Sequence, residues 1–439
     1  MSQAAAMPPP RPIREAAIAL AALGAFFYLS YGLANWLASR RTDVPSIVFD
    51  WEGVVPFLAW TILPYWTTNA FYAVSLFLCR TRDELATLVR RLATTQIVAV
   101  ACFILFPLRF SFARPPADGF AGFMFDALAS FDKPFNQAPS LHIALTIVLW
   151  VHYVRHLPRW GGALLGLWFS LVLVSVLTTY QHHFIDIPTG ALLGWLAIWL
   201  WPDEGGSPLG AWNLSREPKR RRLALRYGLG ALVLAALASL GGGLALLLLW
   251  PALACALVAL AYLGLGPGAF QKDVDGRLSL AASWLFAPYL AAASLNAWLW
   301  TRRDRAAGLV ADGVAIGPLP RRGEPGAGTL VDLCAELPAP AQGWRVHALP
   351  ALDLVPVPPA IALEAADRIE RARRRGPVRV SCALGYGRSA TAVGIWLLHT
   401  GRAATPGDAV AMVRKARPRA VVGESELSAI LAATAAPRP

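Results

Sequence analysis

The segment "VRVSCALGYGRSATAVG" (residues 378–394) joins a short β-like run to a glycine-rich turn and then to a helix-forming stretch. Cys382 ends the β-like run, and Arg388 follows it after five intervening residues. Gly385 and Gly387 let the backbone curl between them, so that successive N–H groups can point at one anion. The positive end of the helix that follows strengthens this field and favours the thiolate form of a cysteine. The segment therefore predicts a phosphate-binding loop with a nucleophilic sulfur.

Two further side chains of this loop fit covalent phosphate chemistry. Arg388 can hold two phosphate oxygens in a bidentate manner, and the Ser389 hydroxyl can hydrogen-bond the sulfur when it becomes a leaving group. The pattern resembles the C-x5-R loop of the protein tyrosine and dual-specificity phosphatases, although Ser381 stands where that family has a histidine. The resemblance implies Cys382 as nucleophile, Arg388 and the loop glycines as phosphate ligands, and an aspartic acid on a separate loop as general acid.

The best candidate for that acid is Asp353, in "HALPALDLVPVP", because it follows a candidate strand and lies 29 residues before Cys382. Asp332 and Asp367 are the alternatives. Their predicted contexts, a strand and a helix, suit structural roles better.

From about residue 305 the chain has the character of an α/β domain. "GTLVDLCAEL" and "GPVRVSCAL" indicate short buried strands, whereas "PPAIALEAADRIERARRR" and "SATAVGIWLLHTG" indicate helices. Strands that alternate with helices favour an α/β fold. We therefore expect residues 305–439 to form one cysteine-phosphatase domain of ordinary size.

The sequence before this domain is too apolar for an ordinary soluble protein. Over all 439 residues, 56% are apolar and 15% are charged, and the charge-free runs are long enough to cross a membrane. The distribution of arginines in the loops predicts six membrane helices within residues 1–202 with both ends cytoplasmic. A basic cytoplasmic linker over 203–226 and a transmembrane hairpin over 227–265 follow.

The expected fold class is therefore multi-domain. An α-helical polytopic membrane domain, made of a six-helix core plus a helical hairpin, precedes a cytoplasmic α/β cysteine-phosphatase domain. The expected location is the inner membrane of a bacterium.

Residues 278–301 are apolar but contain Pro288, and the charged "TRRDR" follows them directly. An interfacial or re-entrant helix fits these features, with a ninth crossing as the alternative. The segment and the "DGVAIGPLP" that follows resemble the start of the mitochondrial lipid-directed dual-specificity phosphatases, which remove a terminal phosphate from phosphatidylglycerophosphate. That resemblance implies that 278–301 lies beside the membrane and that Cys382 is cytoplasmic.

The formal net charge of +13 does not indicate a nucleic-acid partner, because the basic residues cluster at helix ends as the positive-inside rule requires. We expect membrane lipids as partners instead. The five cysteines show neither paired nor metal-ligand spacing, so no disulfide framework is expected.

A second candidate site lies in the membrane half. The fragments "APSLH" (138–142) and "SVLTTYQHHFIDI" (175–187) bring His142, His182 and Asp186 to the same predicted membrane face. A spacing of four puts His182 and Asp186 on one helical face, so the carboxylate can hold one imidazole nitrogen and leave the other as a nucleophile. A second histidine nearby can protonate a leaving oxygen. Ionisable groups at membrane depth favour a functional interpretation.

These fragments resemble motifs of the phosphatidic acid phosphatase type 2 superfamily, whose members share a six-helix membrane core with K-x6-RP, PSGH and SR-x5-H-x3-D motifs. The resemblance implies the roles of phosphohistidine nucleophile, partner carboxylate, general acid and phosphate ligand for His182, Asp186, His142 and Ser140, respectively.

Two of the motifs are incomplete. Arg114-Pro115 is in place, but Pro107 stands where a lysine is expected and Val176 where an arginine is expected. The resemblance leaves Arg114, helped by Arg109, to hold the phosphate. The altered pattern is closer to the inositol-phosphorylceramide-synthase-like branch, which transfers a phosphoryl head group between lipids by the same histidine chemistry.

The sequence thus predicts a bifunctional lipid phosphatase or phosphotransferase that acts on a phospholipid or sphingolipid phosphate. Neither site is expected to need a metal or a cofactor, since imidazole and thiolate are the nucleophiles. The alternative is a catalytically weak, lipid-binding membrane anchor for a protein tyrosine or serine/threonine phosphatase.

Overall fold

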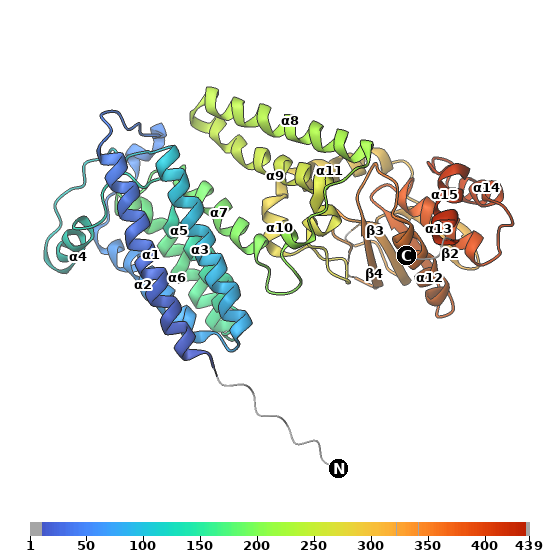
Figure 1. Cartoon of the computed structure of the whole chain (residues 1–439), viewed down its shortest axis with the longest axis horizontal. Helices are drawn as coiled ribbons and strands as arrows, with labels where there is room; N and C mark the ends of the chain where they lie inside the picture. Colours follow the sequence, from blue (N-terminus) through green and yellow to red (C-terminus); the bar gives the residue numbers. More distant parts are fainter. Residues whose placement is uncertain (1–10, 322, 341, 436–439) are drawn as a thin grey trace, which may run out of the picture. The chain divides into compact units, whose positions relative to one another are not determined.

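The computed structural model of the protein describes residues 11–321, 323–340 and 342–435. These residues group into two compact units, which Figure 1 shows in the colours of the sequence. The first unit extends to Ser207 and takes in Leu237–Leu248, and the second comprises Pro208–Ala236 and the chain from Leu249 onward.

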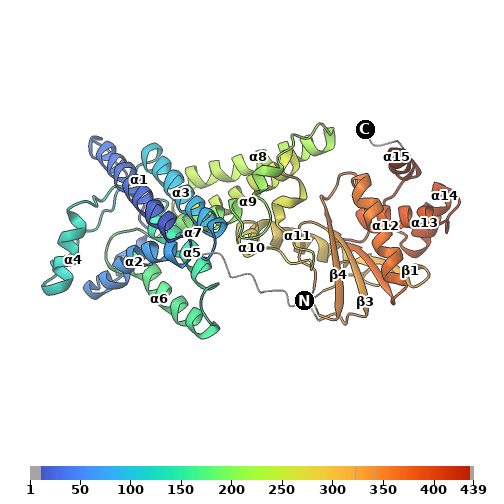
Figure 2. The ribbon, with the colours of Figure 1, turned by 60° about the horizontal axis from the view of Figure 1, so that its bottom comes forward.

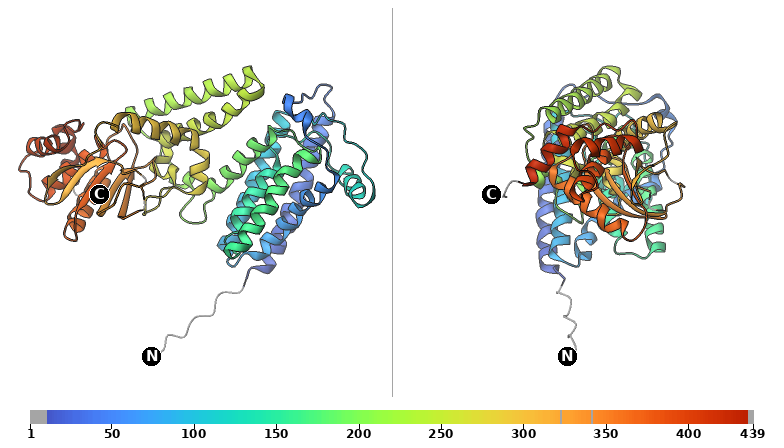
Figure 3. Two further views of the ribbon diagram at one scale, coloured as in Figure 1. Left: turned by 180° about the vertical axis from the view of Figure 1, so that it is seen from behind. Right: turned by 90° about the vertical axis from the view of Figure 1, so that its right-hand side faces the viewer.

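The first unit is entirely helical, and its long helices run side by side (Figures 1 and 3). Its α-helices are α1 (Ile13–Ser39), α2 (Ile62–Leu78), α3 (Arg82–Leu105), α4 (Gly119–Ala129), α5 (Leu141–Tyr153), α6 (Arg159–Thr178) and α7 (Asp186–Leu200). Two short 3-10 helices, Asp50–Val54 and Ala59–Thr61, precede α2.

Five helical segments of the described chain are long and apolar enough to cross a membrane: α1, α3, α6, Pro218–Gly241 and Gly243–Phe270. Only three of them lie within residues 1–202, where we expected six. The 13-residue α5 rises only about 20 Å, against a hydrocarbon core of about 30 Å. It is short because residues 134–140 form a loop, which carries Ser140 to the start of the helix.

Two glycines set the packing of α5 against α7. A Cβ on Gly190 would lie 2.5 Å from the Ser140 carbonyl oxygen, and one on Gly194 would lie 2.8 Å from the Ala144 carbonyl oxygen. Small residues four apart let two helical backbones approach closely. The Ser140 N–H also donates to the Asp186 carbonyl oxygen at 3.1 Å. The starts of α5 and α7, which carry the two histidine fragments, are therefore held together.

The second unit contains a five-stranded sheet in the order β1-β2-β5-β3-β4. The strands are β1 (Gly308–Ala311), β2 (Val314–Pro318), β3 (Gly328–Cys334), β4 (Trp344–Ala351) and β5 (Val378–Cys382). All neighbouring pairs are parallel except β1 with β2. Figure 2 shows helices beside these strands, namely α12 (Pro359–Arg373), α13 (Arg388–His399), α14 (Pro406–Ala416) and α15 (Glu424–Ala435).

The sheet is buried on both faces. The larger core lies between the strands and α12–α15 and includes Val331, Val380, Ile369 and Trp396, none of which is exposed. On the other face, Leu330 and Leu337 pack with alanines of α11 (Ala287–Thr301). The sequence prediction of an α/β domain in this part of the chain is confirmed.

The bounds of the helical segments before the sheet differ from the expected segment bounds. Helix α8 begins at Pro218 and runs to Gly241, so it includes the last nine residues of the expected 203–226 linker. Lysine and arginine are good helix formers, and proline is favoured in the first turn, so the basic run extends the helix. Residues 278–301 form two helices, α10 (Leu280–Leu285) and α11, with Phe286 at the junction.

Residues 271–279 pack on the sheet, so the expected domain start at 305 is too late. The Ala348 N–H of β4 donates to the Val274 carbonyl oxygen at 3.1 Å, and the Ala339 N–H donates to that of Gly276 at 2.8 Å. The chain between α9 (Leu249–Leu260) and α10 therefore borders β4 and the loop after β3.

Lys272 fixes this segment in the interior. Its fully buried ammonium group pairs with the equally buried Asp332 carboxylate. It also donates to the carbonyl oxygens of Cys334 and Leu337 at 2.6 Å each. Three donors thus meet three acceptors, which satisfies a charge that would otherwise be costly to bury.

We expect Lys272→Met to destabilise the full-length protein by about 3–5 kcal/mol, because it leaves a buried carboxylate without its cation. Thermal unfolding in detergent, followed by tryptophan fluorescence, measures the effect. Lys415→Met removes an exposed lysine and is the control. Equal stability of the two variants would contradict a stabilising role for Lys272.

Candidate active sites

The cysteine loop lies at the carboxyl end of the central strand β5, where parallel sheets commonly bind ligands. Strand β5 ends at Cys382, and α13 begins at Arg388. The Cys382 Sγ is buried and lies 3.4 Å from the Ser389 Oγ. The hydroxyl is thus within reach of the sulfur, as leaving-group stabilisation requires.

The loop backbone has little room to change. Gly385 has φ +73°, and a Cβ there would lie 2.3 Å from the Gly317 carbonyl carbon, so only glycine fits. The loop carbonyls of Tyr386 and Leu384 accept hydrogen bonds from the Val421 N–H at 2.7 Å and the Arg417 guanidinium at 3.1 Å. A Cβ at Gly387 would meet no atom within 4 Å, so the backbone there borders open space.

Arg388 is held on three sides. Its Nη1 and Nη2 bind the two oxygens of Glu336 at 2.8 and 2.7 Å. Nη1 also donates to the Ala351 carbonyl oxygen at 2.8 Å, and Nη2 lies 3.2 Å from Asp353 Oδ1. Its Nε is buried and has no hydrogen-bond partner among the described residues. An anion in the loop can satisfy this donor, since a buried unpaired N–H is costly.

The pairing keeps both partners charged. Burial opposes ionisation of Glu336, but the Arg388 guanidinium outweighs it and lowers the pKa of the carboxyl group. Burial likewise opposes the charge on Arg388, yet Glu336 raises the pKa of the guanidinium well above its usual value. A bidentate, charge-assisted pair of this kind fixes the plane of the guanidinium.

Asp353 lies beside the loop, as a general acid would. It follows β4, and its side chain is 40% exposed while it contacts Arg388. Loss of hydration raises the pKa of Asp353, although Arg388 opposes this, and a raised pKa favours the protonated form that an acid needs. Asp332 instead pairs with Lys272, and Asp367 pairs with His399 at 3.7 Å. Among the described residues, Arg388 forms its ion pairs with Glu336 and Asp353 and not with either alternative.

The sequence interpretation missed the groups that support the loop. Glu336 and Lys272 were not expected near Arg388. Glu336 follows β3 by two residues and therefore lies at the same sheet edge as Cys382. The sequence feature that could have identified Glu336 is an acidic residue directly after a predicted buried parallel strand.

In the first unit, His182 and Asp186 meet, but not along one helical face as their spacing suggested, because α7 begins only at Asp186 and His182 lies in the turn before it. His182 Nδ1 lies 3.0 Å from Asp186 Oδ2, and both side chains are buried. Because a carboxylate only accepts, Nδ1 carries the proton and Nε2 carries the lone pair. The Ser140 hydroxyl lies 3.2 Å from Nε2 and can donate to it. The imidazole is thus oriented at both nitrogens, and its lone pair is on Nε2.

His142 lies near His182 but in different surroundings. The centroids of the two rings are 6.3 Å apart. The His142 ring stacks on Tyr65, with centroids 4.0 Å apart. Proximity of the two histidines is thus observed, whereas the acid role of His142 stays a prediction.

A cavity of about 350 Å³ opens beside His182. Arg114 and Lys133 both line it, whereas neither Arg109 nor His142 does. Lys133 was not expected from the sequence. It places a second cation on the lining of the same cavity as Arg114. Arg114 also lies over the Phe125 ring, 4.6 Å from its centroid.

His183, which the sequence left without a role, is part of a buried dyad. Its Nδ1 lies 2.8 Å from Glu52 Oε2, and its Nε2 accepts from the Ser111 N–H at 3.2 Å. Glu52 also accepts from the Phe184 N–H at 3.1 Å. The dyad therefore ties the turn after α6 to the loop that carries Arg114.

Comparison with solved structures finds likeness in the C-terminal α/β domain. Tk-PTP in its active form is 25% identical over 29% of this chain and 94% of that chain, with a TM-score of 0.25. Human DUSP28 is 23% identical over 29% of this chain and 97% of that chain, with a TM-score of 0.27. PTPMT1 in complex with PI(5)P is 15% identical over 29% of this chain and 99% of that chain, with a TM-score of 0.23. No protein-family model and no curated protein matches the chain.

We expect Glu336→Gln to lower kcat/KM for a small aryl phosphate by about 100-fold, because the Arg388 plane is no longer fixed and small displacements cost that much. Competitive inhibition by inorganic phosphate should weaken in parallel. Both are measured on the full-length protein. Glu364→Gln alters an exposed helix pair and should change neither value. An unchanged phosphate inhibition constant in Glu336→Gln would refute the positioning role.

Proposed function

We propose that the C-terminal domain is a cysteine-dependent phosphomonoester hydrolase. The observation that carries the proposal is the convergence of three groups on one strand–loop–helix unit: the Cys382 sulfur, the Ser389 hydroxyl beside it and the unpaired Arg388 Nε. The bound phosphate would lie in the loop, with its oxygens on the backbone N–H groups and on Arg388.

The reaction takes two steps. The Cys382 thiolate attacks phosphorus, an S–P bond forms, the P–O bond to the leaving group breaks, and Asp353 gives its proton to the leaving oxygen. Water then attacks phosphorus and gives its proton to Asp353. The S–P bond breaks, inorganic phosphate leaves, and Ser389 stabilises the departing thiolate.

We favour a lipid head-group phosphate as the substrate. The apolar segment Gly243–Phe270, which is long enough to cross a membrane, reaches the acid loop directly. The Tyr262 hydroxyl of this segment donates to the Asp353 carbonyl oxygen at 3.0 Å. This contact supports a catalytic loop close to the membrane surface, where a lipid phosphate is presented. A cytoplasmic location of the domain, in a bacterial inner membrane, is part of the proposal.

For the first unit we propose phosphohistidine chemistry on a phospholipid or sphingolipid phosphate. His182 Nε2 would attack phosphorus and form an N–P bond as the leaving oxygen departs with a proton from His142. Water or a lipid hydroxyl would then take the phosphoryl group. The oriented His182 and the cations Arg114 and Lys133 around one cavity support this proposal. A lipid-binding anchor without catalysis is the alternative.

Two variants of the full-length protein separate the sites. Cys382→Ser should abolish hydrolysis of a small aryl phosphate, because a serine hydroxyl is a far weaker nucleophile, whereas His182→Gln should leave it unchanged. His182→Gln should instead abolish phosphate release from, or transfer between, labelled lipids when Cys382 is already serine. Assays with and without an alcohol acceptor distinguish hydrolysis from transfer. Lipid turnover that persists in His182→Gln would favour the anchor.

Asp353→Asn should lower kcat by about 100-fold or more for poor leaving groups and much less for good ones. Because the pKa of Asp353 is raised, wild-type activity should persist to higher pH and fall as pH rises through that pKa. The variant should lack this alkaline decline. Equal losses for all leaving groups, or an unchanged pH profile, would exclude Asp353 as the acid.

A further inference from the structure

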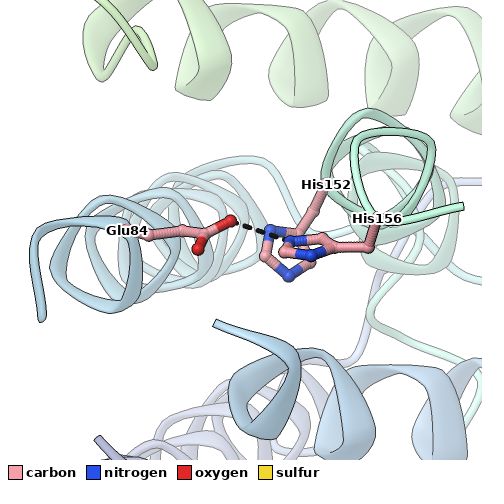
Figure 4. Close-up of side chains that lie close together, drawn as sticks. All are labelled: Glu84, His152 and His156. Atoms are coloured by element: carbon pink, nitrogen blue, oxygen red, sulfur yellow. Dashed lines mark hydrogen bonds and ion pairs between the residues drawn. The ribbon is translucent and has the colours of Figure 1, made fainter. Parts of the chain in front are cut away.

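Three potential metal ligands converge at one end of the first unit, away from the His142–His182 site. Glu84 lies in the first turn of α3, and His152 and His156 lie in and just after the last turn of α5 (Figure 4). One ligand atom of each lies within 4.8 Å of the other two. His142 and His152 are ten residues apart on α5, which corresponds to about 15 Å along the helix axis.

The hydrogen bonds around this cluster leave metal-binding atoms available. His152 Nε2 lies 3.1 Å from the Ser75 carbonyl oxygen, which only accepts, so Nε2 carries the proton and Nδ1 the lone pair. Glu84 Oε2 accepts from the Arg80 N–H at 2.8 Å. Oε1 faces His156 Nε2 at 2.8 Å. The Ser75 carbonyl behind His152 and the Arg80 N–H behind Glu84 are the kind of support that orients metal ligands.

We propose that Glu84, His152 and His156 bind a divalent transition-metal ion of the Zn²⁺ class. Two imidazoles and one carboxylate form a ligand set that suits zinc. Without a metal, Glu84 Oε1 and His156 Nε2 are 2.8 Å apart and share one proton in a hydrogen bond. Replacing that proton by a metal with bonds of about 2.0–2.1 Å needs only a small widening.

The site has room for a fourth ligand. His152 is buried, whereas Glu84 and His156 border a cavity of about 340 Å³ that also has Arg80, Asp83, Arg155 and Asp203 on its lining. Arg155 is paired with Asp203, which reduces its repulsion of a cation. Water from this cavity can complete a tetrahedral shell.

The ion would join the start of α3 to the end of α5. A clamp at these helix ends stabilises the helical unit by binding the folded state alone. It would lie on the opposite end of α5 from His142, so it acts on the fold and not on the transferred phosphate. The proposal is independent of the function proposed for either active site.

The test uses the full-length protein in detergent, dialysed against trace Zn²⁺ and analysed by elemental mass spectrometry. We expect one bound Zn²⁺ per chain and a rise in Tm when Zn²⁺ is added to chelator-treated protein. Co²⁺ substitution should give the intense visible absorption of a four-coordinate site. Wild-type protein that retains no Zn²⁺ and shows no Tm rise would overturn the proposal without any variant.

Variants assign the ligands. His156→Gln and Glu84→Gln should each lose the bound Zn²⁺ and the Tm rise, whereas His399→Gln, which changes an exposed histidine, should keep both. Circular dichroism and gel filtration show whether a variant is folded. A folded His156→Gln protein that keeps its full complement of Zn²⁺ would refute the site. If Glu84 and His156 form only an ion pair, neither the wild-type protein nor any variant will bind Zn²⁺, and the proposal is overturned.

Discussion

The buried pair of Arg388 with Glu336 is the constraint on which the cysteine site depends. Arg388, the proposed phosphate ligand, is not free to rotate, because one carboxylate holds both Nη atoms; its Nε has no hydrogen-bond partner among the described residues. The pair is costly to bury unless every remaining group is satisfied. Lys272 contributes to this, because it binds the carbonyls of Cys334 and Leu337 on either side of Glu336. Lys272 therefore helps to fix the loop after β3.

The two candidate sites solve one problem with different nucleophiles. At Cys382 the groups proposed to hold the anion, namely loop N–H groups, a helix start and one arginine, all belong to one short stretch of chain. At His182 the nucleophile is oriented by Asp186 and Ser140, whereas the cations come from loops far apart in the sequence. The Cys382 site therefore depends mainly on the conformation of one short segment. The His182 site forms only when α5 and α7 pack closely, which Gly190 and Gly194 permit.

Sequence patterns predicted which helices, strands and loops form the two candidate sites better than they predicted where those elements begin and end. The strand–loop–helix at 378–399 follows from local sequence patterns, whereas His182 meets Asp186 across the turn before α7 and not along one helical face. Within residues 1–202, three described helices are long and apolar enough to cross a membrane where six spans were expected, because an apolar run does not reveal where a loop interrupts the helix. The start of the α/β domain was placed too late, since Lys272 looks like any solvated lysine until its three acceptors are seen.

By itself the sequence indicated the candidate chemical residues: a cysteine and an arginine on one loop, and a histidine and an aspartate four residues apart. These depend on short-range geometry, which spacing encodes directly. Only the tertiary structure decided which distant groups support them: Glu336 for Arg388, Lys133 beside Arg114, and the cluster of Glu84 with His152 and His156. Such partners are brought together by packing of separate elements, and no local period in the chain records that contact.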